Sequence, residues 1–172
     1  YAHEVAVIIQ HGLKRMVQDQ ENVWYYITLM NENYPHPGLK KGQEEGILRG
    51  MYLLREGPAG SGMGKSIARV QLLGSGTILR EVIAGAELLE KDFGGSADIW
   101  SITSFNELRR DGMSAERHNL LHPSAPRRKS YVETCLEGRT GPVVASTDYM
   151  RAFAEQVRSQ IPRRFVVLGT DG

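Results

Sequence analysis

Cysteine is nearly absent from this chain of 172 residues, which contains Cys135 alone. One thiol cannot close a disulfide within the chain and cannot build a thiolate metal site. This scarcity excludes the class of small secreted domains that are stapled by disulfides. It is typical of a reducing compartment, so we expect a cytoplasmic location and a buried, apolar role for Cys135.

An excess of one charge and a long apolar run are also missing. The 21 basic and 20 acidic side chains leave a formal net charge of +1, so we expect neither nucleic acid nor a membrane as a partner. No run approaches the roughly 20 apolar residues that a membrane-spanning helix needs. The N-terminus lacks the basic start of a signal peptide. The chain begins at Tyr1 rather than Met, so we expect a processed or truncated sequence.

Two kinds of apolar pattern alternate along the chain. In one, apolar residues recur every 3.6 residues, and the other consists of short β-branched or aromatic runs. The run at 23–29 suits a strand that is buried on both faces of a parallel sheet. We expect helices at residues 2–21, 77–92, 105–110, 114–121, 131–136 and 148–160, and strands at 23–29, 51–54, 67–73, 98–103, 142–146 and 165–168. Strands that alternate with helices predict an α/β fold with a mostly parallel sheet.

Both ends of this pattern look incomplete. One helix and one strand at the start do not make a domain, and the last strand stops near Gly172 without the helix that normally covers a parallel sheet. Residues 30–66, rich in glycine and proline, separate the two regular parts. We therefore expect the end of one α/β domain, a connector, and most of a second α/β domain.

Two glycine-rich turns invite a nucleotide-binding interpretation, but neither has the required context. Residues 59–66 fit a permissive phosphate-loop pattern containing Lys65, yet such a loop must open into a helix, whereas Ser66 leads into an expected strand. Gly74-Ser75-Gly76 lies between a strand and a helix, but the dinucleotide spacing places its third glycine at Leu79. We interpret them as a linker and a structural turn, with nucleotide binding through Lys65 as an open alternative.

Three histidines are candidates for chemistry. His118 and His122 have the i, i+4 spacing of a helical metal pair, but no third ligand accompanies them, so a surface or capping role is favoured. His36 lies in an irregular loop beyond the carboxyl end of an expected strand, where α/β proteins place functional groups. A packing or hydrogen-bonding role is the alternative for His36.

Charged groups give weaker candidates. The basic run at 127–129 could attract phosphate or an acidic protein surface, although such runs are usually solvated. Only Asp148 and Asp171 stand just past strand ends, so no catalytic acid–base pair can be assembled from spacing. The residues by themselves therefore assign no catalytic, cofactor-binding or metal-binding side chain.

Longer sequence words resemble one enzyme family from end to end. They are Asn31-Glu32-Asn33-Tyr34, Glu44-Glu45-Gly46-Ile47, Val70-Gln71-Leu72-Leu73-Gly74-Ser75-Gly76, Thr103-Ser104-Phe105-Asn106-Glu107-Leu108, Asn119-Leu120-Leu121-His122-Pro123, Ser146-Thr147-Asp148-Tyr149-Met150 and Leu168-Gly169-Thr170-Asp171-Gly172. In order and spacing the chain resembles the C-terminal third of the homodimeric bacterial pyruvate dehydrogenases. Several sequence segments that match one family in the same order are more specific evidence than any single motif.

The resemblance implies a transketolase-like architecture. Residues 1–35 correspond to the end of a middle, pyrimidine-binding domain, residues 36–66 to a connector, and residues 67–172 to a truncated C-terminal domain. In this family thiamine diphosphate and Mg²⁺ lie between domains of two subunits, so activity requires a homodimer. The family's cofactor ligands and catalytic residues fall in segments before Tyr1, and none is carried over to this chain.

The resemblance also implies a reaction. The family decarboxylates pyruvate, a 2-oxo acid, and passes the acetyl unit to the lipoyl group of dihydrolipoyl acetyltransferase, with the cofactor supplying the carbanion chemistry. The part in hand is expected to contribute scaffold and dimer contacts and to be inactive in isolation. The alternative is a non-catalytic interaction module that helps assemble the complex through residues 123–129.

Overall fold

The computed structural model describes residues 1–58 and 68–171, so the predicted linker that contains Lys65 lies outside the described residues. Its helices are α1 (Ala2–Leu13), α2 (Glu44–Arg49), α3 (Ile78–Phe93), α4 (Phe105–Leu121), α5 (Tyr131–Leu136) and α6 (Arg151–Glu155), with a π-helical turn at Lys14–Gln18 and a 3-10 turn at Arg158–Gln160. Its strands are β1 (Met51–Arg55), β2 (Arg69–Ser75), β3 (Ser96–Ile102), β4 (Val143–Met150) and β5 (Phe165–Thr170).

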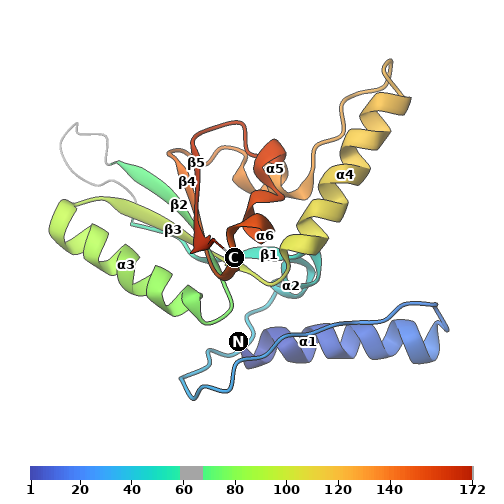
Figure 1. Cartoon of the computed structure of the whole chain (residues 1–172), viewed down its shortest axis with the longest axis horizontal. Helices are drawn as coiled ribbons and strands as arrows, with labels where there is room; N and C mark the ends of the chain where they lie inside the picture. The colour runs from blue at the N-terminus through green and yellow to red at the C-terminus, as the bar shows by residue number, and fades with distance from the viewer. Residues whose placement is uncertain (59–67, 172) are drawn as a thin grey trace.

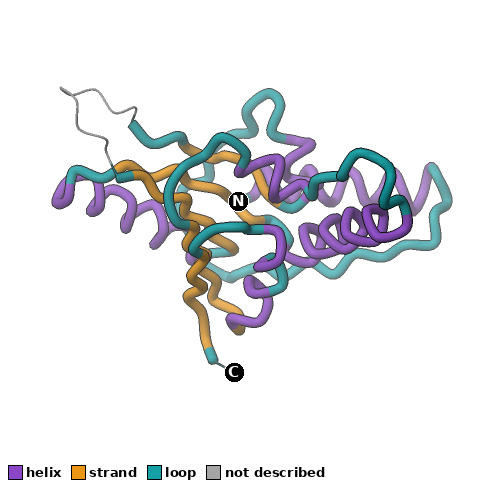
Figure 2. Tube along the Cα trace, turned by 90° about the horizontal axis from the view of Figure 1, so that it is seen from above, coloured by secondary structure: helices purple, strands orange, loops and turns teal. Residues whose placement is uncertain are grey.

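The strands form one sheet in the order β1-β3-β2-β4-β5. Strands β3, β2, β4 and β5 are parallel, and β1 joins the edge of β3 in the antiparallel direction. This confirms the expected α/β class and the mostly parallel sheet. Figure 2 shows the strands as one layer between helices.

Helices cover the two faces of the sheet unequally. On one face α3 packs through Leu79, Val82 and Ala86 against the first half of β3. On the other face α4, α5 and α6 enclose a larger core that includes Leu108 and Val132 (Figure 1). All seven residues of β3 are buried, because this strand lies between β1 and β2 and is covered on both faces.

Local signals explain several helix ends. Ser104 accepts a hydrogen bond from the Glu107 N–H at 3.1 Å and so caps α4. Ser130 and Glu133 form a reciprocal capping box at the start of α5. Gly94 ends α3 with φ +62°, a left-handed conformation that glycine adopts without strain.

Two helix predictions were wrong in extent. The stretches expected at 105–110 and 114–121 form the single helix α4, because Gly112 does not break it but packs against Gln160, where a Cβ would lie 2.7 Å from the Gln160 side chain. The helix expected at 148–160 begins only at Arg151, because β4 continues to Met150 to pair with β5. Both errors come from tertiary contacts that local periodicity does not contain.

The predicted strand at 23–29 is also wrong for the described structure, where the segment is extended but unpaired. It runs back along α1 (Figure 1), and Tyr25 packs against Gly12 and receives a hydrogen bond from Arg15 at 3.2 Å. Trp24 and Tyr26, on the opposite side, are each 82% exposed. The alternating pattern of a strand is present, but no strand among the described residues lies beside it.

Within residues 1–58 and 68–171, every helix is too short or too polar to cross a membrane.

Candidate functional site

The carboxyl edge of the sheet is where this topology can build a site. The chain leaves β2 through α3 to reach β3 on one side, and later enters β4 on the other side of β2. Ligands in open α/β sheets bind at such a switch point, beyond the carboxyl ends of the strands. The segment that follows α1 also returns to this edge, so the side chains gathered here come from both regular parts of the sequence.

Glu4, in the first turn of α1, ties that helix to the sheet. Its side chain is only 7% exposed, and it accepts hydrogen bonds from the Tyr52 hydroxyl at 2.8 Å and the Ser101 hydroxyl at 2.5 Å. Burial, followed by the negative charge of Glu4, raises the pKa of Tyr52, so the phenol stays protonated and remains a donor. Two hydroxyls from β1 and β3 thus hold one buried carboxylate from α1.

Two histidines flank this contact. His3 lies 2.8 Å from the Pro37 carbonyl oxygen through Nδ1 and 3.3 Å from the Tyr52 hydroxyl through Nε2. Since a carbonyl only accepts, Nδ1 of His3 carries a proton. His36 accepts the Ala2 N–H through Nδ1 at 3.1 Å, which leaves the proton of its neutral ring on Nε2.

Arg80, in the first turn of α3, holds the loop that contains His36. Its guanidinium lies 3.3 Å from a Glu32 carboxylate oxygen and 4.9 Å from the centre of the Tyr34 ring. The Tyr34 and His36 rings are 4.7 Å apart. The edge therefore presents imidazole, phenol and guanidinium groups, which can hydrogen-bond an anionic or carbonyl group.

The switch point itself is filled by the chain's own carboxylate. Thr77 donates a hydrogen bond to Asp148 at 3.2 Å, and a Cβ at Gly76 would lie 3.3 Å from the same carboxylate. Gly76 has φ +67°, which favours glycine. A turn follows β2 as predicted, but it is displaced along the chain, because Gly74 and Ser75 still belong to β2 and the turn consists of residues 76–77.

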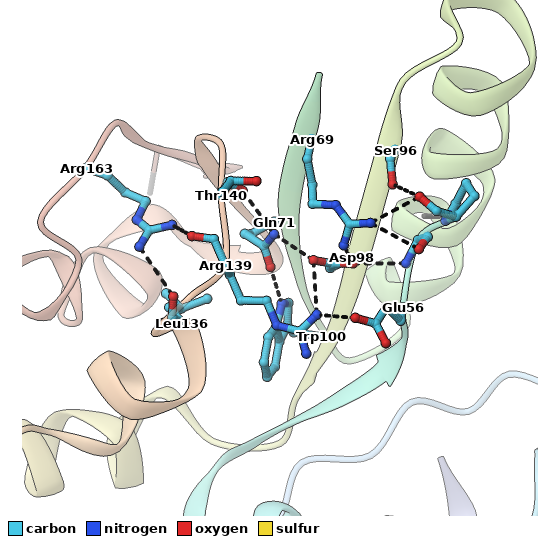
Figure 3. A network of polar contacts seen from close by, with 12 residues as sticks. Glu56, Arg69, Gln71, Ser96, Asp98, Trp100, Leu136, Arg139, Thr140 and Arg163 are labelled. Atoms are coloured by element: carbon cyan, nitrogen blue, oxygen red, sulfur yellow. Dashed lines mark hydrogen bonds and ion pairs between the residues drawn. The ribbon is translucent and has the colours of Figure 1, made fainter. Parts of the chain in front are cut away.

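A second polar cluster lies at the opposite, amino edge of the sheet (Figure 3). Asp98 of β3 is fully buried and accepts hydrogen bonds from the Gly57 N–H at 2.9 Å, from Arg69 at 2.7 Å and from Gln71 at 2.8 Å. Burial opposes its ionisation, but the Gly57, Gln71 and Arg69 hydrogen bonds hold the pKa of Asp98 below its usual value. Arg139 adds a contact at 3.5 Å. The carboxylate is ionised and paired.

The same cluster joins the connector to the sheet. Ser96 bonds the Pro58 carbonyl at 2.9 Å through its hydroxyl and the Ala68 carbonyl at 3.0 Å through its backbone N–H. Arg139 reaches Glu56 at 2.7 Å. The shallow hollow beside it, about 370 Å³, is lined by groups that are already paired here, Arg69 and Arg139 among them. We assign this edge a structural role.

The remaining sequence candidates join neither of these two clusters. The rings of His118 and His122 are 4.7 Å apart, and the described residues hold no group of three His, Cys, Asp or Glu side chains that could bind a metal ion. Asp171 pairs with Arg151 at 3.3 Å rather than with Asp148. Cys135 is half-buried, and burial raises the pKa of its thiol.

Sequence reasoning missed Glu4 and Asp98. Glu4 carries no signal of burial in the sequence, because an acidic residue in the first turn of a helix is common on exposed helices. Asp98 did carry a signal, because it lies directly between Ala97 and Ile99 in an apolar strand, and a charge in that setting is normally paired. Its partners come from 27 to 41 residues away, so only the fold identifies them.

Comparison with known proteins accounts for the two regular parts. The family described as the transketolase-like TK C-terminal domain matches residues 50–172, and the pyruvate dehydrogenase E1 component middle domain matches residues 1–37. The chain is 57% identical to the pyruvate dehydrogenase E1 component of Pseudomonas aeruginosa, 55% to that of Cupriavidus necator and 52% to that of Escherichia coli K12. Each match covers the whole chain but 19% of the relative.

These matches confirm the resemblance drawn from the sequence words. They also separate the residues that meet at the carboxyl edge into two groups. Glu4 and His36 come from the part that matches the middle domain, and Tyr52, Arg80 and Ser101 come from the part that matches the C-terminal domain. The chain belongs to the family of transketolase-like C-terminal domains, which it joins to the end of a pyruvate dehydrogenase E1 middle domain.

Proposed function

We propose that this chain is part of a pyruvate dehydrogenase E1 component, an oxidoreductase that decarboxylates pyruvate and transfers the acetyl unit to the lipoyl group of dihydrolipoyl acetyltransferase. Within that enzyme its residues fix the middle domain against the C-terminal domain. The proposal includes the division at residues 35 and 66, a homodimeric enzyme and a cytoplasmic location. Identity of 52–57% to proteins named pyruvate dehydrogenase E1 component supports the reaction.

The observation that carries the scaffold role is the buried carboxylate of Glu4. It bridges the segment that matches the middle domain to Tyr52 and Ser101 of the C-terminal domain. A buried carboxylate is costly unless it is hydrogen-bonded. The position of α1 on the sheet in which Glu4 reaches both hydroxyls is therefore favoured. The contact between Arg80 and Glu32 adds a second tie across the same seam.

Thiamine diphosphate and Mg²⁺ do not fit the residues of this chain. Its described part brings no three metal-ligating side chains together, and Asp148 occupies the amino end of α3, where a diphosphate would otherwise be favoured. Thiamine diphosphate supplies the carbanion chemistry in the enzyme that holds it. We therefore assign the cofactor and its ion to other parts of the longer enzyme and none of the catalytic residues to this chain.

The test compares the 172-residue chain with a full-length enzyme that contains it. We expect pyruvate decarboxylation and thiamine diphosphate binding by the full-length protein and neither by the isolated chain. Turnover by the isolated chain would contradict our site assignment, and a full-length protein that does not decarboxylate pyruvate would contradict the reaction.

A variant tests the scaffold role separately. In the full-length enzyme, Glu4→Ala removes the acceptor for both hydroxyls at the seam, and we expect a lower melting temperature together with reduced turnover. Glu107→Gln, which removes only an exposed contact with Arg110 at 2.6 Å, is the matched control and should change neither. Equal melting temperatures and equal turnover in the two variants would contradict the scaffold role of Glu4.

A non-catalytic interaction module remains the second candidate. The protruding end of α4 favours it, and the basic run at 127–129 was the sequence basis for it. Arg127 is paired with Glu133 at 2.6 Å, however, and Lys129 is paired with Glu137. Within the described ranges Arg128 is the one basic side chain of this run that forms no ion pair.

A further inference from the structure

Two histidine–tyrosine pairs hold α1 in place, one near each end of the helix. His3 lies 3.3 Å from the Tyr52 hydroxyl through Nε2, and His11 lies 3.1 Å from the Tyr25 hydroxyl through Nδ1. Both imidazoles are half-buried. The two phenols have different further partners, and this difference sets how many protons each histidine must carry.

The Tyr25 phenol has its proton free for His11. Arg15 donates a hydrogen bond to the Tyr25 oxygen at 3.2 Å, and a guanidinium cannot accept one. The hydroxyl of Tyr25 can therefore donate to Nδ1 of His11, which accepts in the neutral form of the ring. This pair requires no charge on His11.

The Tyr52 phenol has no proton left for His3. Its hydroxyl donates to the buried Glu4 carboxylate at 2.8 Å, and a charged acceptor forms a stronger hydrogen bond than a neutral imidazole at 3.3 Å. The Tyr52 oxygen can then only accept, so Nε2 of His3 must donate. Nδ1 of His3 donates as well, because it faces the Pro37 carbonyl oxygen at 2.8 Å. An imidazole that donates through both nitrogens is a cation.

The surroundings of His3 suit a positive charge, because the Glu4 carboxylate lies one hydrogen bond beyond it, on the other side of Tyr52. The titratable and charged groups around this contact are Tyr1, Glu4, Glu32, Tyr34, His36, Tyr52 and Arg80. The charge of Arg80 is paired with Glu32. The Tyr1 nitrogen, which contacts Glu4, is an uncharged peptide N–H within a longer chain.

His36 responds to pH in the opposite sense. Its Nδ1 accepts the Ala2 N–H at 3.1 Å, and this acceptor is lost when the ring gains a second proton. The neutral ring of His36 and the charged ring of His3 therefore make the contacts at this seam. A variant at position 3 leaves His36 unchanged and so separates the two effects.

We propose that His3 is a proton-dependent link between the part of the chain that matches the middle domain and the part that matches the C-terminal domain. Histidines change charge between about pH 5 and pH 8. The imidazolium makes one more hydrogen bond than the neutral ring, so the link is complete at the acid end of this range and weakens as the pH rises through it. This inference rests on the proposed function and deepens the scaffold role within it.

The test compares the cost of removing each histidine at pH 6 and at pH 8, in a full-length enzyme that contains this chain. Glutamine keeps an N–H donor but has no charge at either pH. We expect His3→Gln to lower the melting temperature by at least about 2 °C at pH 6 and by less than about half as much at pH 8. His11→Gln is the matched control, and its effect should be no larger at pH 6 than at pH 8.

Replacing the phenol gives an independent measurement. Burial raises the pKa of Tyr52, so its hydroxyl is protonated at both pH values, and Tyr52→Phe should also cost more at pH 6. In the Tyr52→Phe protein, His3→Gln should lose most of its pH dependence.

Equal effects of His3→Gln at the two pH values would overturn the proposal, as would a pH dependence that survives undiminished in Tyr52→Phe. Should His3→Gln fail to fold, the comparison of wild type with Tyr52→Phe decides, and an equal cost at both pH values refutes the link. Melting temperatures are measured without turnover. A wild-type enzyme that melts as expected but cannot decarboxylate pyruvate would instead contradict the proposed function.

Discussion

Replacing Asp98 by asparagine exchanges one carboxylate oxygen in the amino-edge cluster for an NH2 group, which removes the charge and one hydrogen bond. The new amide keeps an oxygen that can accept hydrogen bonds from Arg69 and the Gly57 N–H. Its nitrogen, however, faces the Gln71 side-chain nitrogen, which in the native protein donates to Asp98 at 2.8 Å. Gln71 cannot turn over to compensate, because its oxygen accepts the Trp100 Nε1–H at 2.9 Å and the indole only donates. Two donors are then left facing each other in the core.

The expected loss of stability follows from the interactions that the substitution removes. Removing one partner from a buried charge pair costs about 3–5 kcal/mol, and a hydrogen bond to a charged group contributes about 1.5–3 kcal/mol. The Arg69 side chain is 20% exposed, so water can solvate part of the orphaned charge and the lower end applies. We expect Asp98→Asn to lower the free energy of unfolding by about 3 kcal/mol.

Urea unfolding followed by tryptophan fluorescence measures this directly, because Trp100 is buried in the cluster and Trp24 is exposed. The matched control is Asp171→Asn, whose carboxylate is 85% exposed and paired with Arg151, where we expect a change within about 0.5 kcal/mol. If both variants unfold at the same urea concentration, the account of Asp98 is refuted. Because the pKa of Asp98 is lowered on folding, its contribution should be complete above about pH 4 and decline as the pH falls further.

Three further predictions concern other parts of the fold. Gly141→Ala should prevent stable folding, because Gly141 has φ +88° and a Cβ would lie 1.7 Å from the Arg69 carbonyl oxygen. Gly85→Ala, in open space on α3, should raise stability by about 0.5–1 kcal/mol, as urea midpoints would show. Since folding raises the pKa of Tyr52, stability should fall as the pH rises above about 10. Tyr52→Phe should weaken that alkaline loss, whereas equal loss in both proteins would contradict it.

The alternation of periodicities was enough to predict most of the sheet. The expected strands at 51–54, 98–103, 142–146 and 165–168 are confirmed with shifts of a few residues, as is the helix at 77–92. These elements are amphipathic or fully buried, so the pattern of apolar residues records their environment. The direction of β1 was not predicted, because antiparallel pairing depends on where β3 lies rather than on residues 51–55.

The candidate site also combines residues that the sequence predicted with contacts that it could not predict. His36 was identified as a candidate from its loop beyond a run of apolar residues, yet its contacts with the Ala2 N–H and with the Tyr34 ring depend on how the loop returns to α1. The tie from Arg80 to Glu32 joins residues 48 positions apart in the chain. Such pairs have no local signature, because each side chain by itself looks like an ordinary exposed charge.

By itself the sequence determined the α/β class and the family resemblance, because these depend on composition, short-range periodicity and the order of its longer motifs. Only the tertiary structure decided that Glu4 and Asp98 are buried carboxylates and that 105–121 is one helix. Burial and ion pairing are set by residues distant in the chain, and the free-energy cost of burying a charge depends on whether such a residue pairs with it.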